Sequence, residues 1–326
     1  METTVTQKRK RNDSTPDERS IWTSMSILTL SGIMLTIAVV WRVVDQFVLG
    51  LGNTWMNILP SKLFPFLIIF GFFWKYRRDE IASVLGLSKY MLRAQIVAGL
   101  FVGFLVSAGI DLGGTILYGL VIDPAYPLEL HILNQDLLGY LFFFFLTNAF
   151  LEEILFRGLI LNSLKTRYSP KIAILISAVL FGIWHAGWPL LNASPGESVI
   201  TTVAMMVFFT TILGLLFGIY YERLSSGKSL MGLIVAHTIF NFIGENFKIG
   251  PEPVMQGPDL GFANSGVMVV SMVLFLLIFS VLFFVFWRYK IEQFSEDWNR
   301  VSRRVKTTLT GLSKKVTAKQ DNCFEV

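Results

Sequence analysis

Residues 138–161 read LGYLFFFFLTNAFLEEILFRGLIL, an apolar run of 24 residues that contains three charged side chains. A helix needs about 20 apolar residues to cross the hydrocarbon core of a bilayer, so this run is long enough to span a membrane. Each charged side chain inside such a helix costs about 2.5–3.5 kcal/mol to insert and marks a candidate functional site. The stretch therefore predicts a transmembrane helix with a polar site in it.

Seven further apolar runs have the same character. They cover about 21–41, 60–76, 95–122, 171–189, 199–221, 229–247 and 265–288. The runs at 60–76 and 171–189 are short, and the first of these two also carries Lys62. The run at 21–41 is too long for a secretory signal, so we expect an uncleaved anchor. The sequence thus predicts an all-α fold, a polytopic bundle of about eight transmembrane helices.

The composition agrees with this prediction. Hydrophobic residues make up 53% of the chain, charged residues 16%, and the mean hydropathy is +0.58. A soluble chain has roughly 25% charged residues, so a soluble protein is excluded. The single cysteine, Cys323, excludes an intramolecular disulfide framework. We expect one bundle at 21–288, preceded by a polar basic segment at 1–20 and followed by a basic tail at 289–326.

The distribution of lysine and arginine predicts the orientation of the bundle. With eight spans, 25 of the 28 basic residues fall on the side that holds both termini. They lie in 1–20, 75–95, 157–171, 222–228 and 288–326. Basic residues favour the cytoplasmic side of short loops, which predicts cytoplasmic termini, with a bacterial-type plasma membrane as the expected location. The net charge of +5 then reflects topology, and no nucleic-acid partner is expected.

The tail has the pattern of a basic amphipathic helix. Its apolar residues recur at spacings of three and four: Ile291, Phe294, Trp298, Val301, Val305, Leu309, Leu312 and Val316. The basic residues between them are Arg300, Arg303, Arg304, Lys306, Lys314 and Lys315. Helices of this kind bind anionic membrane surfaces, so the inner leaflet of the lipid bilayer is an expected partner. A solvated tail is the alternative.

Three of the predicted helices carry polar groups at a matched depth. LEEILFRG contains Glu152, Glu153 and Arg157, FGIWH contains His185, and HTIFN contains His237 and Asn241. At about 1.5 Å per residue, Glu152 and His185 lie roughly 20 Å from the nearest cytoplasmic charges. His237 and Asn241 lie roughly 14 and 20 Å from theirs. A shared depth favours one convergent site over scattered polar residues.

Helix geometry predicts how these groups divide. Glu153 and Arg157 are four residues apart, share a helix face and are expected to pair. Glu152 is rotated by about 100° from Glu153, so the two glutamates are expected to have different partners, with Glu152 facing the histidines. Asn148, one turn earlier, is a candidate hydrogen-bond partner for Glu152. The alternative is structural, because polar groups also join helices within membranes.

These side chains suit the hydrolysis of an amide bond. A buried glutamate can act as general base, a histidine can relay the proton, and a histidine with an asparagine can donate to the oxyanion. The sequence contains neither GxSxG nor HExxH, which argues against serine hydrolases and ordinary zinc proteases. Glu152, His185 and His237 are nevertheless a ligand set that catalytic zinc uses. The residues alone therefore permit a metal-activated or a glutamate-activated water, and the cofactor stays unknown.

The three motifs together resemble those of the CPBP family, the type II CAAX prenyl endopeptidases and their bacterial Abi relatives. The matching strings are Glu152-Glu153-x-x-x-Arg157, Phe181-x-x-x-His185 and His237-x-x-x-Asn241. The resemblance covers about residues 137–247. It implies an all-helical intramembrane endopeptidase, a peptidase whose site opens toward the cytoplasm.

The resemblance also implies roles and substrates. The implied roles are water activation for Glu152 with His185, oxyanion stabilisation for His237 with Asn241, and orienting support for Glu153 with Arg157. Eukaryotic members cut the last three residues from prenylated proteins, which implies a protein or peptide substrate that carries a lipid. Bacterial members include bacteriocin-immunity proteins, so a non-catalytic membrane scaffold is an alternative function. A proton-coupled transporter is another, because carboxylates and histidines also relay protons.

Overall fold

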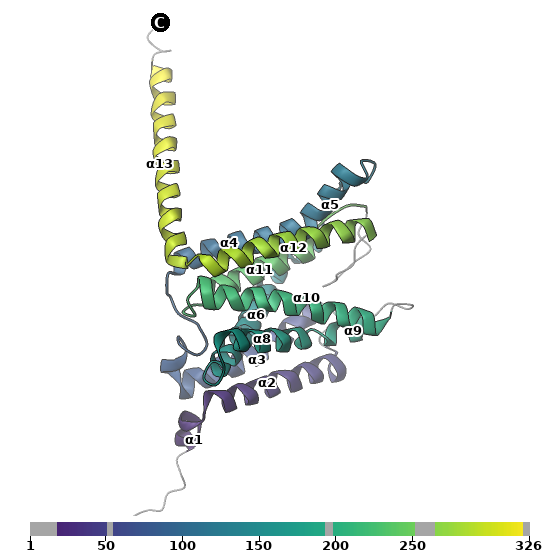
Figure 1. Ribbon diagram of the computed structural model, residues 1–326, viewed down its shortest axis with the longest axis vertical. Coiled ribbons are helices and arrows are strands. Elements are labelled where there is room, and N and C mark those ends of the chain that lie inside the picture. Colours follow the sequence, from purple (N-terminus) through teal and green to yellow (C-terminus); the bar gives the residue numbers. More distant parts are fainter. Residues whose placement is uncertain (1–17, 51–54, 193–197, 252–264, 322–326) are drawn as a thin grey trace, which may run out of the picture.

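The computed structural model describes residues 18–50, 55–192, 198–251 and 265–321, and most of them are helical (Figure 1). The α-helices are α1 Glu18–Ser24, α2 Ile27–Val43, α3 Trp55–Tyr76, α4 Leu92–Ser107, α5 Gly114–Leu117, α6 Leu138–Glu153, α7 Leu161–Leu164, α8 Pro170–Trp184, α9 Gly187–Asn192, α10 Val199–Ile219, α11 Met231–Asn246, α12 Ser265–Arg288 and α13 Ile291–Asp321. The π-helical segments are η1 Val44–Val48, η4 Ala108–Gly113, η5 Tyr118–Ile122, η7 Ile154–Ile160 and η8 Tyr220–Leu224, and the 3-10 turns are η3 Arg78–Glu80 and η6 Gln135–Leu137. The predicted all-α class is confirmed.

Besides helices and the loops that connect them, the described ranges contain one small sheet. Strand β1 Leu130–Ile132 pairs antiparallel with β2 Phe247–Ile249, with His131 opposite Lys248. These strands connect the chain just before α6 to the end of α11. The sheet therefore joins the two helices that carry Glu152 and His237.

Five helical stretches are long and apolar enough to cross a membrane. They are 27–48, 92–122, 135–164, 199–224 and 265–288. The other three predicted spans coincide with α3, α8 and α11, of which α8 is apolar but shorter. A helical membrane bundle is thus confirmed, whereas the number of eight spans stays a prediction.

Two helices begin elsewhere than predicted. The chain bends between α1 and α2, where the Ser26 side chain caps α2 by accepting a hydrogen bond from the N–H of Thr29 at 3.1 Å. Helix α3 already begins at Trp55 and contains Pro60 and Pro65. Within a membrane bundle, neighbouring groups can satisfy the backbone that a proline frees, so Pro60 does not mark the start of the helix.

Close packing places the helices that carry the histidines. Helix α11 packs against both α4 and α6, and α10 packs along α8. A Cβ atom on Gly99 of α4 would lie only 2.2 Å from the backbone oxygen of Gly232 in α11, and one on Gly182 of α8 only 2.0 Å from Oγ1 of Thr211 in α10. Small residues allow this approach of membrane helices, which brings α11 against α4 and α8 against α10.

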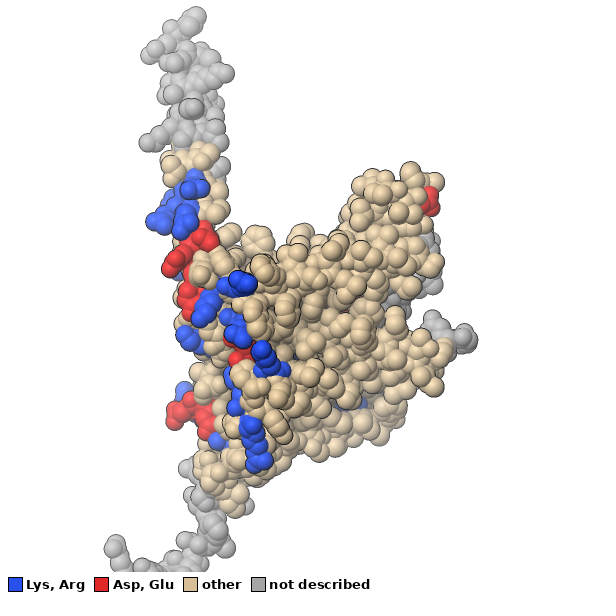
Figure 2. Space-filling model, in the orientation of Figure 1, with Lys and Arg blue, Asp and Glu red and all other residues tan. Residues whose placement is uncertain are grey.

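Charged side chains gather along one edge of the bundle (Figure 2). Helix α2 begins and α12 ends at this edge, and α13 leaves it across the direction of α4 and α12 (Figure 1). Ile291 at the start of α13 is fully buried. The ring of Trp298 packs edge-to-face against the ring of Phe101 of α4, with 6.1 Å between the ring centres. The predicted tail helix is confirmed as a helix. The side chains of Leu309, Leu312, Val316, Lys314 and Lys315 lie outside the described residues.

Candidate active site

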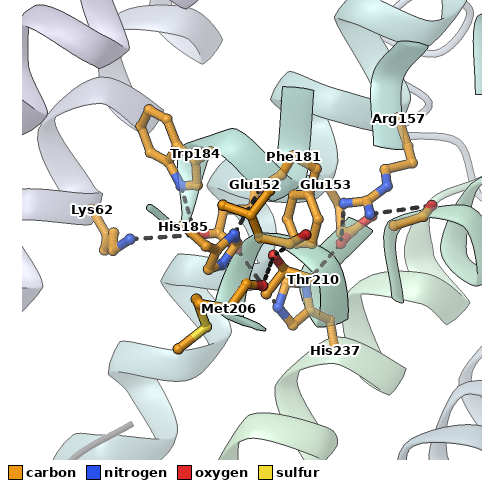
Figure 3. A network of polar contacts seen from close by, with 12 residues as sticks. Lys62, Glu152, Glu153, Arg157, Phe181, Trp184, His185, Met206, Thr210 and His237 are labelled. Atoms are coloured by element: carbon orange, nitrogen blue, oxygen red, sulfur yellow. Dashed lines mark hydrogen bonds and ion pairs between the residues drawn. The ribbon is translucent and has the colours of Figure 1, made fainter. Parts of the chain in front are cut away.

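The bundle brings five of the six polar motif residues into one cluster (Figure 3). Glu152 and Glu153 end α6, Arg157 lies in η7, His185 caps the end of α8 and His237 lies in α11. Both glutamates, Arg157 and His237 are buried. Three helices that are distant in sequence thus meet at one buried polar centre.

The two carboxylate oxygens of Glu152 have different surroundings. Oε1 accepts hydrogen bonds from Nζ of Lys62 at 3.3 Å and from Nε1 of Trp184 at 3.1 Å. Oε2 is buried and has no hydrogen-bond partner. It lies 3.8 Å from Nε2 of His185 and 3.7 Å from Nε2 of His237. One oxygen is therefore held in place, while the other faces two imidazole nitrogens.

Glu153 forms a second group of contacts beside the first. Its Oε1 accepts from NH1 of Arg157 at 3.1 Å and from Nδ1 of His237 at 2.7 Å. The guanidinium of Arg157 lies 4.0 Å above the ring of Phe181, and its NH2 reaches the backbone oxygen of Gly214 at 3.5 Å. The expected contact between Glu153 and Arg157 is present, and Phe181 packs against it.

The contacts determine which histidine nitrogens donate. Nδ1 of His185 lies 2.8 Å from the backbone oxygen of Phe181. A carbonyl oxygen only accepts, so Nδ1 carries a proton, and Nε2 of the neutral ring presents a lone pair to Glu152. The same reasoning applies to His237, whose Nδ1 donates to Glu153. Two Nε2 atoms thus point at the unpartnered oxygen of Glu152.

Two details of the expected geometry are wrong. The glutamates share a partner, because His237 contacts Glu153 through Nδ1 and Glu152 through Nε2. Helix rotation separates the two carboxylates, but the nitrogens of one imidazole point in different directions and bridge them. Asn148 does not bond to Glu152 either, and its Oδ1 has no hydrogen-bond partner.

Asn241 is the motif residue that the structure leaves apart. It lies one turn beyond His237 on α11 and is half-buried, and its side chain makes no hydrogen bond with the described residues. The side chain of His185 is 22% exposed, whereas that of Glu152 is 1% exposed. His185 is therefore the most exposed side chain of the cluster.

Sequence reasoning missed Lys62 and Trp184. Lys62 lies in an apolar run, and a buried charge in an apolar helix is itself a signal of function. Trp184 directly precedes His185, but a tryptophan in an apolar helix carries no signal of a polar role. Their shared contact with Glu152 emerges only when α3, α6 and α8 are packed together.

The metal interpretation finds no support in the geometry. Within the described ranges, no group of three or more His, Cys, Asp or Glu side chains is arranged to hold a metal ion. Glu152, His185 and His237 face one another, but they do not form such a group.

One segment in the middle of the chain matches a known protein family. Residues 134–243 match the family described as type II CAAX prenyl endopeptidase Rce1-like. The curated proteins and the solved structures give no match. The matched segment contains all three motifs, and it overlaps the predicted core at 137–247. Residues 134–243 are therefore similar to the Rce1-like type II CAAX prenyl endopeptidases, within a chain whose apolar helices make it an integral membrane protein.

Proposed function

We propose that the protein is an intramembrane endopeptidase in which Glu152 and His185 activate the attacking water. The observation that carries this proposal is the unpartnered Oε2 of Glu152, at 3.7–3.8 Å from two imidazole Nε2 atoms. These distances are too long for direct hydrogen bonds and suit a water molecule that bridges the groups. The family match supports peptidase chemistry at this position.

Glu152 and His185 together account for the proton transfers that hydrolysis of the peptide bond requires. The water oxygen attacks the carbonyl carbon of the scissile peptide bond while Oε2 of Glu152 takes a proton from that water. Nε2 of His185 accepts the second O–H of the same water and orients it. The proton on Glu152 then passes to the amine nitrogen as the C–N bond breaks, which regenerates the carboxylate.

His237 and Asn241 are proposed to stabilise the oxyanion. A carboxylate bonded to Nδ1 stabilises the imidazolium form of a histidine, and Glu153 makes that contact with His237 at 2.7 Å. In the resting site Nε2 of His237 carries no proton; it takes one up when the substrate binds, and Nε2 of the resulting imidazolium donates to the oxyanion. The amide of Asn241, which lacks a hydrogen-bond partner among the described residues, is free to donate beside it. Arg157 fixes Glu153 and thereby supports His237.

The proposed substrate is a protein or peptide whose C-terminal segment carries a lipid and lies at the cytoplasmic membrane surface. The family match suggests this class, and the partial exposure of His185 supports access to the site. A lipid anchor would hold the segment in the bilayer near the buried centre.

Hydrolysis of a prenylated peptide by the purified protein tests the proposal. We expect cleavage by the wild type and loss of cleavage in Glu152→Gln and in His185→Ala. Glu222→Gln is the matched control, because it makes the same substitution outside the cluster. Glu222 pairs with Lys165 and lies beside Gly227. Full cleavage by both site variants would overturn the proposal. If a chelator abolishes cleavage by the wild type and zinc restores it, a metal-activated water replaces the metal-free mechanism.

We further propose that both termini face the cytoplasm of a bacterial-type cell. The gathering of basic residues along one edge supports this orientation (Figure 2). Cys323 is the only cysteine in the chain, so it reports on the tail without engineering. A membrane-impermeant maleimide should label it in inside-out vesicles and leave it unlabelled in right-side-out vesicles. The reverse pattern would contradict the orientation.

Helix α13 is proposed to lie on the anionic inner leaflet. Trp298, Val301 and Val305 are 37%, 52% and 51% exposed along one side of it. Basic residues occupy the other faces, and α13 starts at the charged edge of the bundle. An exposed apolar stripe at this position suits the boundary between headgroups and acyl chains.

A polarity-sensitive fluorophore tests the placement of α13. Attached at Val305→Cys in a Cys323→Ser background, the probe should shift to shorter emission wavelength in nanodiscs with anionic lipid. The same probe at Arg303→Cys, on the opposite side of the helix, should report water. Equal emission from the two positions would show that the helix is solvated.

A further inference from the structure

Lys62 is a buried cation outside the three motifs that contacts the centre of the site. It belongs to α3, is 8% exposed, and donates from Nζ to Oε1 of Glu152 at 3.3 Å. A lysine in the interior of an apolar helix is costly in a membrane. Helix α3 also lies outside the family segment at 134–243. A region without recognisable motifs thus supplies the nearest cation to Glu152.

Trp184 gives the same carboxylate oxygen a second donor. Its Nε1 lies 3.1 Å from Oε1 of Glu152, whereas Oε2 has no hydrogen-bond partner. The carboxylate can exchange its two oxygens only by breaking the bonds to both donors. Oε2 is therefore kept directed at His185 and His237, where a general base must act.

Arg42 and Asp45 lie next to the two side chains that hold Oε1 of Glu152. The guanidinium of Arg42 lies 4.5 Å from the centre of the Trp184 ring. Cations are attracted to the faces of aromatic rings, so Arg42 holds the plane of the indole and leaves its N–H directed at Glu152. Asp45 is fully buried in η1 and lies close enough to Arg42 and Lys62 for an electrostatic interaction with both.

Three acidic side chains around the site face three basic ones. The acidic ones are Asp45, Glu152 and Glu153, and the basic ones are the buried Lys62 and Arg157 and the half-buried Arg42. Removal of Lys62 would leave one carboxylate in excess. A buried carboxylate without a counterion takes up a proton in preference to remaining charged. A protonated Glu152 cannot accept a proton from water.

We propose that Lys62 and Trp184 are positioning residues for Glu152, which together hold Oε1 and leave Oε2 as the reactive oxygen. Helix α3 then completes an active site whose motifs all lie in later helices. This inference rests on the proposed function, because it assigns Lys62 and Trp184 a role relative to Glu152 as general base.

Substitution of Lys62 tests the inference through the pH dependence of hydrolysis. Lys62→Met should lower kcat about 100-fold, the loss typical of a misplaced reactive group, with little change in KM. The acid limb of its pH–rate profile should move to higher pH. Lys62→Arg, which keeps the charge and a donor, should restore most of the activity. Trp184→Phe keeps an aromatic ring and loses the N–H, so it should lower kcat by up to about tenfold.

Lys75→Met is the matched control. It makes the same substitution in the same helix, at an exposed position near the end of α3, and should leave kcat and the pH profile unchanged. Wild-type kcat and pH profile in both Lys62→Met and Trp184→Phe would overturn the inference. If Lys62→Met does not fold, an unaltered kcat in Trp184→Phe overturns the role of Trp184 by itself.

Infrared spectroscopy separates this inference from the proposed function. The carbonyl stretch of a protonated carboxyl group should appear in Lys62→Met, be absent from the wild type and Lys62→Arg, and disappear again in Lys62→Met/Glu152→Gln. A wild type that cleaves no prenylated peptide would overturn the proposed function, yet this band would still show whether Lys62 keeps Glu152 ionised. Its absence from folded Lys62→Met would overturn the inference.

Discussion

Glu152 and Glu153 are neighbours in the sequence, but they draw their partners from different regions of the molecule. Glu153 contacts Arg157 and His237, which both lie in the family segment at 134–243. Glu152 takes one donor, Trp184, from that segment and the other, Lys62, from α3. The segment thus neutralises one of its glutamates by itself and depends on an earlier helix for the other.

This difference separates two kinds of support. A pair four residues apart on one helix forms wherever that helix forms, so Glu153 and Arg157 need little help from the rest of the chain. The contact between Lys62 and Glu152 spans 90 residues and needs α3 to pack beside α6. The family segment therefore carries the groups that we propose to be reactive, and α3, which precedes it, contacts one of them.

The largest expected effect is on catalysis, from Glu152→Gln. Glutamine keeps an oxygen that accepts from Lys62 and Trp184, but it cannot take a proton from water. We expect kcat for a prenylated peptide to fall about 10²–10⁴-fold, the contribution typical of a general base. Size-exclusion chromatography should show a folded protein. Unchanged kcat would remove Glu152 from the reaction and with it the contrast between the two glutamates.

The next largest effect is expected on stability, from Arg157→Met. This change leaves the buried charge of Glu153 without its cation and should lower the free energy of unfolding by about 3–5 kcal/mol. A denaturant titration in detergent micelles measures the loss. The double variant Arg157→Met/Glu153→Gln should recover part of it, since no unpaired carboxylate remains. A double variant less stable than the single one would contradict the pairing.

A smaller effect is expected where α4 meets α11. A Cβ at Gly99 would lie 2.2 Å from the backbone oxygen of Gly232, so Gly99→Ala should push the helices apart and cost about 1–3 kcal/mol of stability. Because α11 carries His237, the variant should also lose hydrolytic activity. Gly71→Ala in α3 is the control, since a Cβ at Gly71 has no atom within 4 Å. Equal unfolding curves for the two variants would show that the close contact is not maintained.

The smallest effect is a pH dependence at the base of α13. The hydrogen bond from Tyr90 lowers the pKa of Glu292 below its usual value. A lowered pKa means that the bond contributes fully above the ordinary pKa of glutamate and is lost as the pH falls through the lowered value. Trypsin should therefore release α13 faster at acidic pH, after correction for the activity of trypsin itself. In Tyr90→Phe, the rate at which trypsin releases α13 should not change across that pH range. If the rate still rises at acidic pH in this variant, the pH dependence does not come from the hydrogen bond between Tyr90 and Glu292.

The sequence patterns were most informative within single helices. Runs of apolar residues predicted where helices form, and the spacing of Glu153 and Arg157 predicted a contact that the structure contains. The prediction failed where one side chain reaches two helices. His237 was expected to serve a single glutamate, yet its two nitrogens contact Glu152 and Glu153. Lys62 was not among the predicted site residues, although it lies against Glu152.

The amino-acid sequence alone determined the class of the protein, the approximate position of most of its long helices and the residues that carry the motifs. These properties follow from composition and from the 3.6-residue period, which both act over short distances along the chain. Only the tertiary structure decided that Oε1 of Glu152 is held by Lys62 and Trp184 and that Oε2 is left to face the histidines. Which faces of separate helices meet depends on the packing of the whole bundle, including close approaches such as that at Gly99. No local pattern records that packing.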